Sequence, residues 1–159
     1  MSDKNYISML RESLEKKIEI LDAILDANEL QREVLTNPMA TPDDLEATYN
    51  RKDELISVME ALDNGFETMY KRVRKELSEN REIYADEIKK MQELISEISD
   101  RSASIRAGEL RNKELATRKF SDLKGKINKV KKSRSAMNSY YQASKISTFE
   151  DASILDSRK

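Results

Sequence analysis

Hydrophobic residues recur at intervals of three and four along most of this chain, from Ile7 to Tyr141. That interval matches the turn of an α-helix, so the pattern predicts amphipathic helices. Turn-forming residues are scarce, since the 159 residues include only three glycines and two prolines. The sequence therefore predicts an all-α fold made of a few long helices.

The first predicted helix covers residues 2–35. Its apolar stripe passes through Asn28 to Leu35, and Ile20 and Ile24 widen it enough to contact two neighbouring helices. An asparagine on such a stripe, here Asn28 and later Asn112, can fix the register between helices. The other stripe residues are Ile7, Leu10, Leu14, Ile18, Leu21 and Leu25.

Both prolines lie between residues 37 and 44, in the clearest break of the pattern. Thr41 suits the N-cap of a helix, and Pro42 suits the first helical position. The two aspartates that follow suit the positive end of the helix dipole. We therefore predict a second helix over residues 42–77. Its stripe consists of Leu45, Tyr49, Ile56, Met59, Leu62, Phe66, Met69, Val73 and Leu77.

The third predicted helix covers residues 80–141. Ser78 and Asn80 can cap its start, but the stripe crosses this point without a proline or glycine. One continuous helix up to about Ile98 is therefore the alternative. Periodicity stops after Gln142, and residues 143–159 are expected to form a flexible tail. The stripe residues are Tyr84, Ile88, Met91, Ile95, Ile98, Phe120, Leu123, Ile127, Val130, Met137 and Tyr141.

The lengths of the three helices decide the predicted architecture. At about 1.5 Å per residue, the first two helices are roughly 50 Å long and the third is roughly 90 Å long. Antiparallel packing then covers only the first half of the third helix. Residues 2–142 are expected to form an elongated antiparallel three-helix coiled-coil bundle with a long projecting C-terminal helix.

The projecting part of the third helix is the candidate binding site, because an apolar stripe exposed to water is a typical docking surface for another helix. Two alternatives use the same stripe: it closes a homodimer, or it turns back and packs as a fourth helix. The candidate partner-binding residues are Phe120, Leu123, Lys124, Ile127, Val130, Lys131, Met137, Tyr140 and Tyr141.

Several chemistries lack the residues that they need. The chain has no cysteine and no histidine, which removes thiol chemistry, the commonest general base and the commonest transition-metal ligand. Di-metal helical bundles need inward-facing Glu and Glu-x-x-His, and no glutamate is expected on the apolar stripe. Glu93, Glu97 and Asp100 are therefore interpreted as surface charges. We expect a protein without enzymatic activity, metal or cofactor.

The charges are unevenly distributed although the net charge is only −1. Residues 111–134 contain ten basic and two acidic side chains, which could lie along nucleic-acid phosphates. The basic residues alternate with an apolar stripe, however, which favours a solvated helix face and argues against nucleic-acid binding. No apolar run approaches the roughly 20 residues of a membrane span, and no signal peptide precedes the first helix. A cytoplasmic protein without membrane insertion is expected.

Three segments of the chain resemble the FlgN-type flagellar export chaperones. They are Tyr6–Leu14 in the first helix, Leu45–Ile56 at the start of the second, and Glu109–Ala116 in the third. The resemblance covers roughly residues 6–141 and extends to the combination of size, a single proline-marked break and a C-terminal tyrosine pair. FliT-like chaperones have a similar helical plan and are not separated from this family by these segments.

The resemblance implies a cytoplasmic chaperone of type III flagellar export. Its clients would be late export substrates, the hook-filament junction proteins of the FlgK and FlgL type, whose terminal helices it would cover. A client helix would pack on the stripe from Phe120 to Met137, with Lys124 and Lys131 beside it. The alternative function is a homodimeric coiled-coil scaffold without a role in export.

Overall fold

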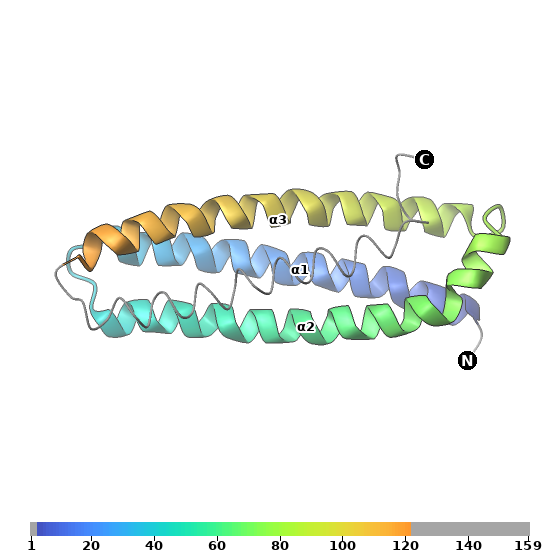
Figure 1. The fold of residues 1–159 in the computed structure, drawn as a ribbon, viewed down its shortest axis with the longest axis horizontal. Coiled ribbons are helices and arrows are strands. Elements are labelled where there is room, and N and C mark those ends of the chain that lie inside the picture. Colours follow the sequence, from blue (N-terminus) through green and yellow to red (C-terminus); the bar gives the residue numbers. More distant parts are fainter. Residues whose placement is uncertain (1–2, 122–159) are drawn as a thin grey trace.

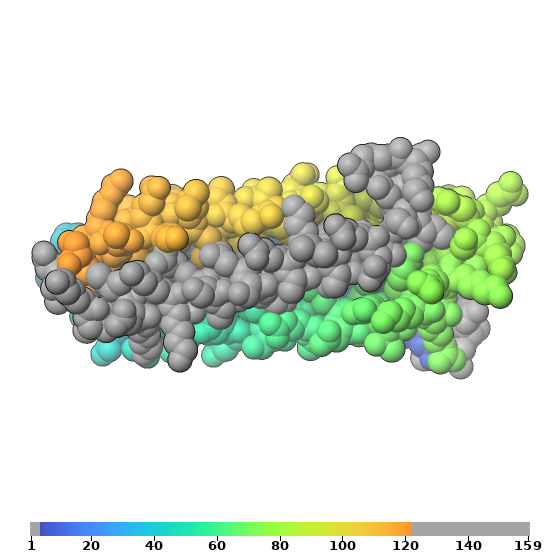
Figure 2. Space-filling view, in the orientation of Figure 1, coloured from blue at the N-terminus to red at the C-terminus, as the bar shows by residue number. Residues whose placement is uncertain are grey.

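The computed structural model describes residues 3–121, and in this part of the chain it contains three α-helices and no strand. The helices are α1 (Asp3–Thr36), α2 (Pro42–Glu79) and α3 (Ala85–Lys119), and they form a long rod (Figure 1). The predicted all-α bundle is therefore confirmed. Figure 2 shows that α2 and α3 both extend along the length of this rod.

Helix α1 is the central element and packs against both α2 and α3. Its contacts with α2 run in opposite directions along the two sequences, because Lys17 pairs with Asp63 while Gln31 bonds to Thr48. Those with α3 run in the same direction, since Arg11 bonds to Glu87 and Asn112 bonds to Gln31. The bundle is therefore up-down-up: α2 is antiparallel to α1, and α3 is parallel to it.

The break between α1 and α2 was predicted, together with Thr41 as the N-cap of α2, and both are confirmed. The backbone N–H of Asp44 donates to Thr41 Oγ1 at 3.2 Å, and the Thr41 N–H donates to Asp44 Oδ2 at 2.8 Å. These two bonds form a capping box, with Pro42 in the first turn of α2. Each satisfies an N–H that the helix start would otherwise leave without a partner.

The second break lies at residues 80–84, so the alternative of one helix continuing to Ile98 is wrong. No proline or glycine produces this break. The Asn80 backbone N–H and its side-chain Nδ2 both donate to the Glu76 carbonyl oxygen, which satisfies the end of α2. The Tyr84 hydroxyl donates to Glu76 Oε1 at 3.3 Å and holds the turn against the last residues of α2.

The third helix is shorter than predicted. A helix over residues 80–141 was expected to project beyond the bundle, but α3 ends at Lys119 and its 35 residues match the 34 of α1. Because the turn returns the chain to the start of α1, a parallel helix of equal length reaches the other end of α1. Phe120 then leaves helical geometry with φ −108° and ψ 18°. Residues 122–141, on which the rest of this prediction falls, lie outside the described residues.

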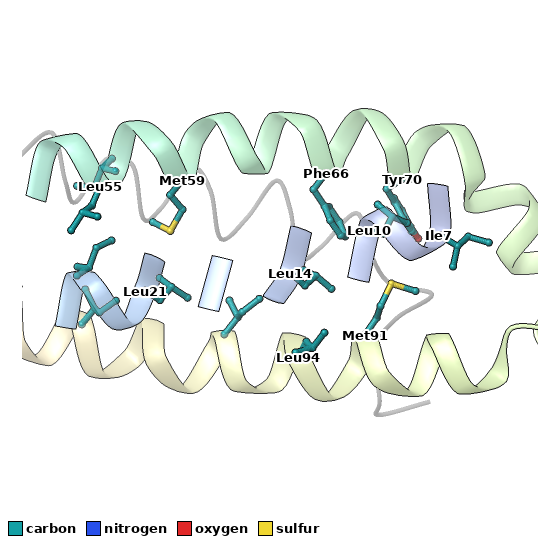
Figure 3. Packing of buried hydrophobic residues seen from close by; sticks show 14 of the residues in the cluster. Ile7, Leu10, Leu14, Leu21, Leu55, Met59, Phe66, Tyr70, Met91 and Leu94 are labelled. Atoms are coloured by element: carbon teal, nitrogen blue, oxygen red, sulfur yellow. The ribbon is translucent and has the colours of Figure 1, made fainter. Parts of the chain in front are cut away.

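The main core lies along α1, which inserts its apolar side chains between α2 and α3. Figure 3 shows this arrangement, with Leu21 on α1 opposite Met59 on α2, and Leu14 on α1 opposite Leu94 on α3. The cluster extends from Ile7 at one end to Ile105 at the other. We call this cluster the main core.

Candidate functional site

Of the nine predicted partner-binding residues, only Phe120 lies in the described part of the chain. Its side chain is only 3% exposed and packs in a small apolar cluster with Leu35, Leu45, Tyr49 and Ala116. We call these five residues the end cluster. Phe120 therefore closes the end of the bundle, and its assignment to an exposed surface is wrong. The remaining eight residues, from Leu123 to Tyr141, lie outside the described residues.

A buried ion pair lies next to the end cluster. The Lys52 Nζ is 2.5 Å from Glu109 Oε1, and the two side chains are 0% and 8% exposed. The same Nζ donates to Gln31 Oε1 at 3.0 Å and lies 5.4 Å from the centre of the Tyr49 ring. Two charges inside a helical bundle are tolerated when they are paired, and here the lysine also donates a hydrogen bond to Gln31.

Amide and hydroxyl groups extend this ion pair across all three helices. Gln31 Nε2 donates to Thr48 Oγ1 at 3.0 Å, and Asn112 Nδ2 donates to Gln31 Oε1 at 3.0 Å and to the Asn28 carbonyl at 2.9 Å. Asn28 Nδ2 donates in turn to the Ile105 carbonyl at 3.4 Å. We call the set the polar layer; it comprises Asn28, Gln31, Thr48, Lys52, Glu109 and Asn112.

The polar layer separates the main core from the end cluster. On α1 and α3 its residues, at positions 28–31 and 109–112, follow the last main-core residue and precede the end cluster. On the antiparallel α2 the order is reversed: Lys52 lies between Tyr49 of the end cluster and Leu55 of the main core, and Thr48 lies beside Tyr49. Such a layer fixes register, because a shifted helix would leave buried donors and acceptors without partners. The placement of Asn28 and Asn112 on the apolar stripe was predicted, and their contribution to register stays a prediction.

The sequence analysis missed Lys52 and Glu109, and it expected no glutamate on the stripe. The signal was present as gaps in the apolar pattern. On α2 the stripe jumps from Tyr49 to Ile56, and Lys52 occupies the place between them. On α1 Gln31 fills the corresponding place before Leu35. Polar side chains that interrupt the stripes of two helices at matching depths indicate a buried polar contact.

Ion pairs along the outside of the α1–α3 interface hold these helices in one register. Arg101 Nε donates to Asp22 Oδ1 at 2.7 Å, and this hydrogen bond raises the pKa of Arg101. Arg11 Nε donates to Glu87 Oε2 at 3.1 Å. Side chains this exposed contribute little to stability individually, at most about 1 kcal/mol each.

A shallow pocket of about 430 Å³ lies between α1 and α3 beside the polar layer. Its lining includes Gly108, where a Cβ would lie 3.2 Å from Asn28 Nδ2, so glycine permits the close approach of the two helices. The one acid in the lining, Glu29, lies 3.7 Å from Arg111 and bonds to Arg32. The lining thus offers no acid and base poised for catalysis.

Within residues 3–121, no group of three or more acidic side chains is arranged to hold a metal ion. None of the three helices combines the length and the hydrophobicity that a membrane span requires.

Comparison with known protein families identifies the family of this chain. The family model described as FlgN protein matches residues 1–147, which include the three helices and the basic, apolar segment after Phe120. No match was found among curated proteins or among solved structures. A family match over this much of the chain establishes membership: the chain belongs to the FlgN family.

Proposed function

We propose that this chain is a cytoplasmic, non-enzymatic chaperone that binds the terminal helices of late flagellar export substrates, the hook-filament junction proteins of the FlgK and FlgL type. The observation that carries the proposal is the FlgN family match over residues 1–147. Membership of this family supports a role in flagellar export in general. The clients and the binding surface are the proposed part.

The proposed client surface is the segment after the described bundle. Its apolar positions Leu123, Ile127, Val130 and Met137 recur at helical intervals, so in a helix they would share one face. A client helix would bury its apolar face against them. Lys124, Lys131, Tyr140 and Tyr141 would lie at the rim, where the lysines favour an acidic client.

The surface of the described bundle supports the assignment of the client surface to the later segment, because it lacks a row of exposed large hydrophobic residues of its own. Its exposed large hydrophobic side chains are single residues far apart in sequence, such as Leu30 on α1, Val58 on α2 and Leu110 on α3, which are 51–61% exposed. None of these has a second exposed large hydrophobic residue three or four positions away on its own helix. Docking a helix needs a row at that spacing, so the described surface does not provide one.

The test is light scattering of the full chain, alone and mixed with junction proteins from its own genome. We expect a stable one-to-one complex with the wild type and none with Ile127→Asp, because a buried carboxylate opposes docking. Val58→Asp is the matched control, since it adds the same charge at an exposed position on α2 and should leave the complex intact. Circular dichroism of both variants should match the wild type.

Two results would contradict the proposal. If Ile127→Asp loses helicity and thermal stability, Ile127 belongs to the folded core. If the chain forms the same homodimer with and without each junction protein, the stripe closes a dimer and the homodimeric scaffold is the better interpretation.

A further inference from the structure

The polar layer divides the bundle across its whole width. All three helices contribute polar side chains at the same depth: Gln31 from α1, Lys52 from α2 and Glu109 from α3. Among residues 3–121, the buried apolar side chains on either side form two separate clusters. Within residues 3–121, hydrogen bonds and one ion pair take the place of apolar side-chain packing at this depth, while the three helices themselves continue through it.

A second buried ion pair within the described residues has a different setting. Lys17 and Asp63 pair at 2.7 Å, with side chains 6% and 13% exposed. At that depth, however, α3 presents the buried apolar residues Leu94 and Ile98, which belong to the main core together with Leu14 and Leu21. The main core thus continues past this pair without interruption, whereas it stops at the polar layer.

The polar layer is incompletely satisfied. Within the described residues, the buried Asn28 Oδ1 has no hydrogen-bond partner, and Glu109 Oε1 has only its ion-pair contact with Lys52 Nζ. A buried acceptor without a partner weakens the structure around it, because it loses its bond to water and gains none in return. The layer is therefore a natural place for cooperative packing to end.

Beyond the polar layer, hydrogen bonds join the end of α3 to the end of α1. The Lys119 ammonium donates to the Asn37 carbonyl at 2.9 Å and to the Val34 carbonyl at 3.5 Å, tying the end of α3 to the end of α1. The last turn of α1 has no basic residue of its own, so Lys119 supplies the cation that suits this helix end. Together with the end cluster, these bonds join three chain segments into one unit.

We propose that this end is a latch that opens as a unit while the main core stays folded. The latch comprises residues 32–49 and 113–121, which include Thr48, and the other residues of the polar layer form its inner boundary. Opening would expose Phe120 and Leu45 together and would release the end of α3 from the end of α1. This inference rests on the described contacts and holds whether or not the chain binds a flagellar client.

Amide hydrogen exchange of the full-length chain tests the latch, because it measures opening residue by residue. We expect the backbone amides of 113–119, 32–36 and 45–49 to share one protection factor, once each rate is divided by its intrinsic rate, at least tenfold lower than that of 88–98 in the main core. The change in rate should fall at positions 109–112 on α3. A gradual rise toward each helix end would be ordinary fraying and would overturn the proposal.

The variant Phe120→Ala separates a cooperative latch from independent helix ends. It should speed exchange on the order of 100-fold not only in α3 but also in residues 32–36 and 45–49, while amides 88–98 stay unchanged. Phe66→Ala is the matched control in the main core, where it should speed exchange throughout the bundle. If Phe120→Ala speeds the main core equally or unfolds the chain, the bundle is one cooperative unit and the latch does not exist.

Discussion

Removing one member of the buried Lys52–Glu109 pair should destabilise the bundle far more than removing both. The two side chains are 0% and 8% exposed with 2.5 Å between the charged atoms, so either single change leaves a charge inside the protein. The free energy of unfolding should fall by about 3–5 kcal/mol in Glu109→Leu. For a chain of this length, that corresponds to a melting temperature lower by about 10 °C.

The double variant Lys52→Met with Glu109→Leu should recover most of this loss, because apolar side chains of similar volume remove the cost of burying two charges. Urea unfolding followed by circular dichroism, applied to both single variants and the double variant, yields the coupling energy of the pair. Glu67→Gln is the control: it breaks the exposed Glu67–Lys71 pair and should cost less than about 0.5 kcal/mol. The reasoning is refuted if Glu109→Leu costs less than about 1 kcal/mol, or if the double variant is no more stable than the weaker single variant.

Two further comparisons test the local structure of the helices. Gly65→Ala should raise the free energy of unfolding by about 0.5–1 kcal/mol, because no atom lies within 4 Å of the added Cβ and alanine favours the helix. Gly108→Ala should lose that gain, since its Cβ would lie 3.2 Å from Asn28 Nδ2; equal melting temperatures for the two variants would contradict this close approach. Thr41→Ala should cost about 1 kcal/mol by removing the cap of α2, whereas Thr68→Ala, at an exposed helical position, should change stability by less than half as much.

The sequence predicted the start of α2 well because local chemistry determines it. Thr41 accepts the bond that a cap should accept, and Pro42 occupies the place where its missing N–H has no cost. The turn at residues 80–84 was harder to predict, since Asn80 and Tyr84 form it through contacts with Glu76 rather than through glycine or proline. Such contacts depend on how the chain folds in three dimensions, so the spacing of apolar and polar residues does not predict them.

The end of α3 could not be predicted from periodicity, because the stripe continues through Phe120 without a break. What ends the helix in the bundle is position: Phe120 reaches the depth at which Leu35 and Leu45 already meet. The stripe alone gives the apolar side of a helix but not the place where its partners stop. The length argument failed for the same reason, since it extended one helix past an end that α1 and α2 define together.

The polar layer has no explanation in stability alone. Apolar residues at positions 52 and 109 would avoid the cost of burying two charges and would bring apolar side chains between the end cluster and the main core, beside the four remaining polar residues of the layer. Lysine and glutamate at these positions instead keep the two clusters apart and hold the helices in one register. If the double variant is as stable as the wild type, the pair's contribution must lie in that separation rather than in added stability. Hydrogen exchange of the same double variant then shows directly whether the two ends of the bundle have become one unit.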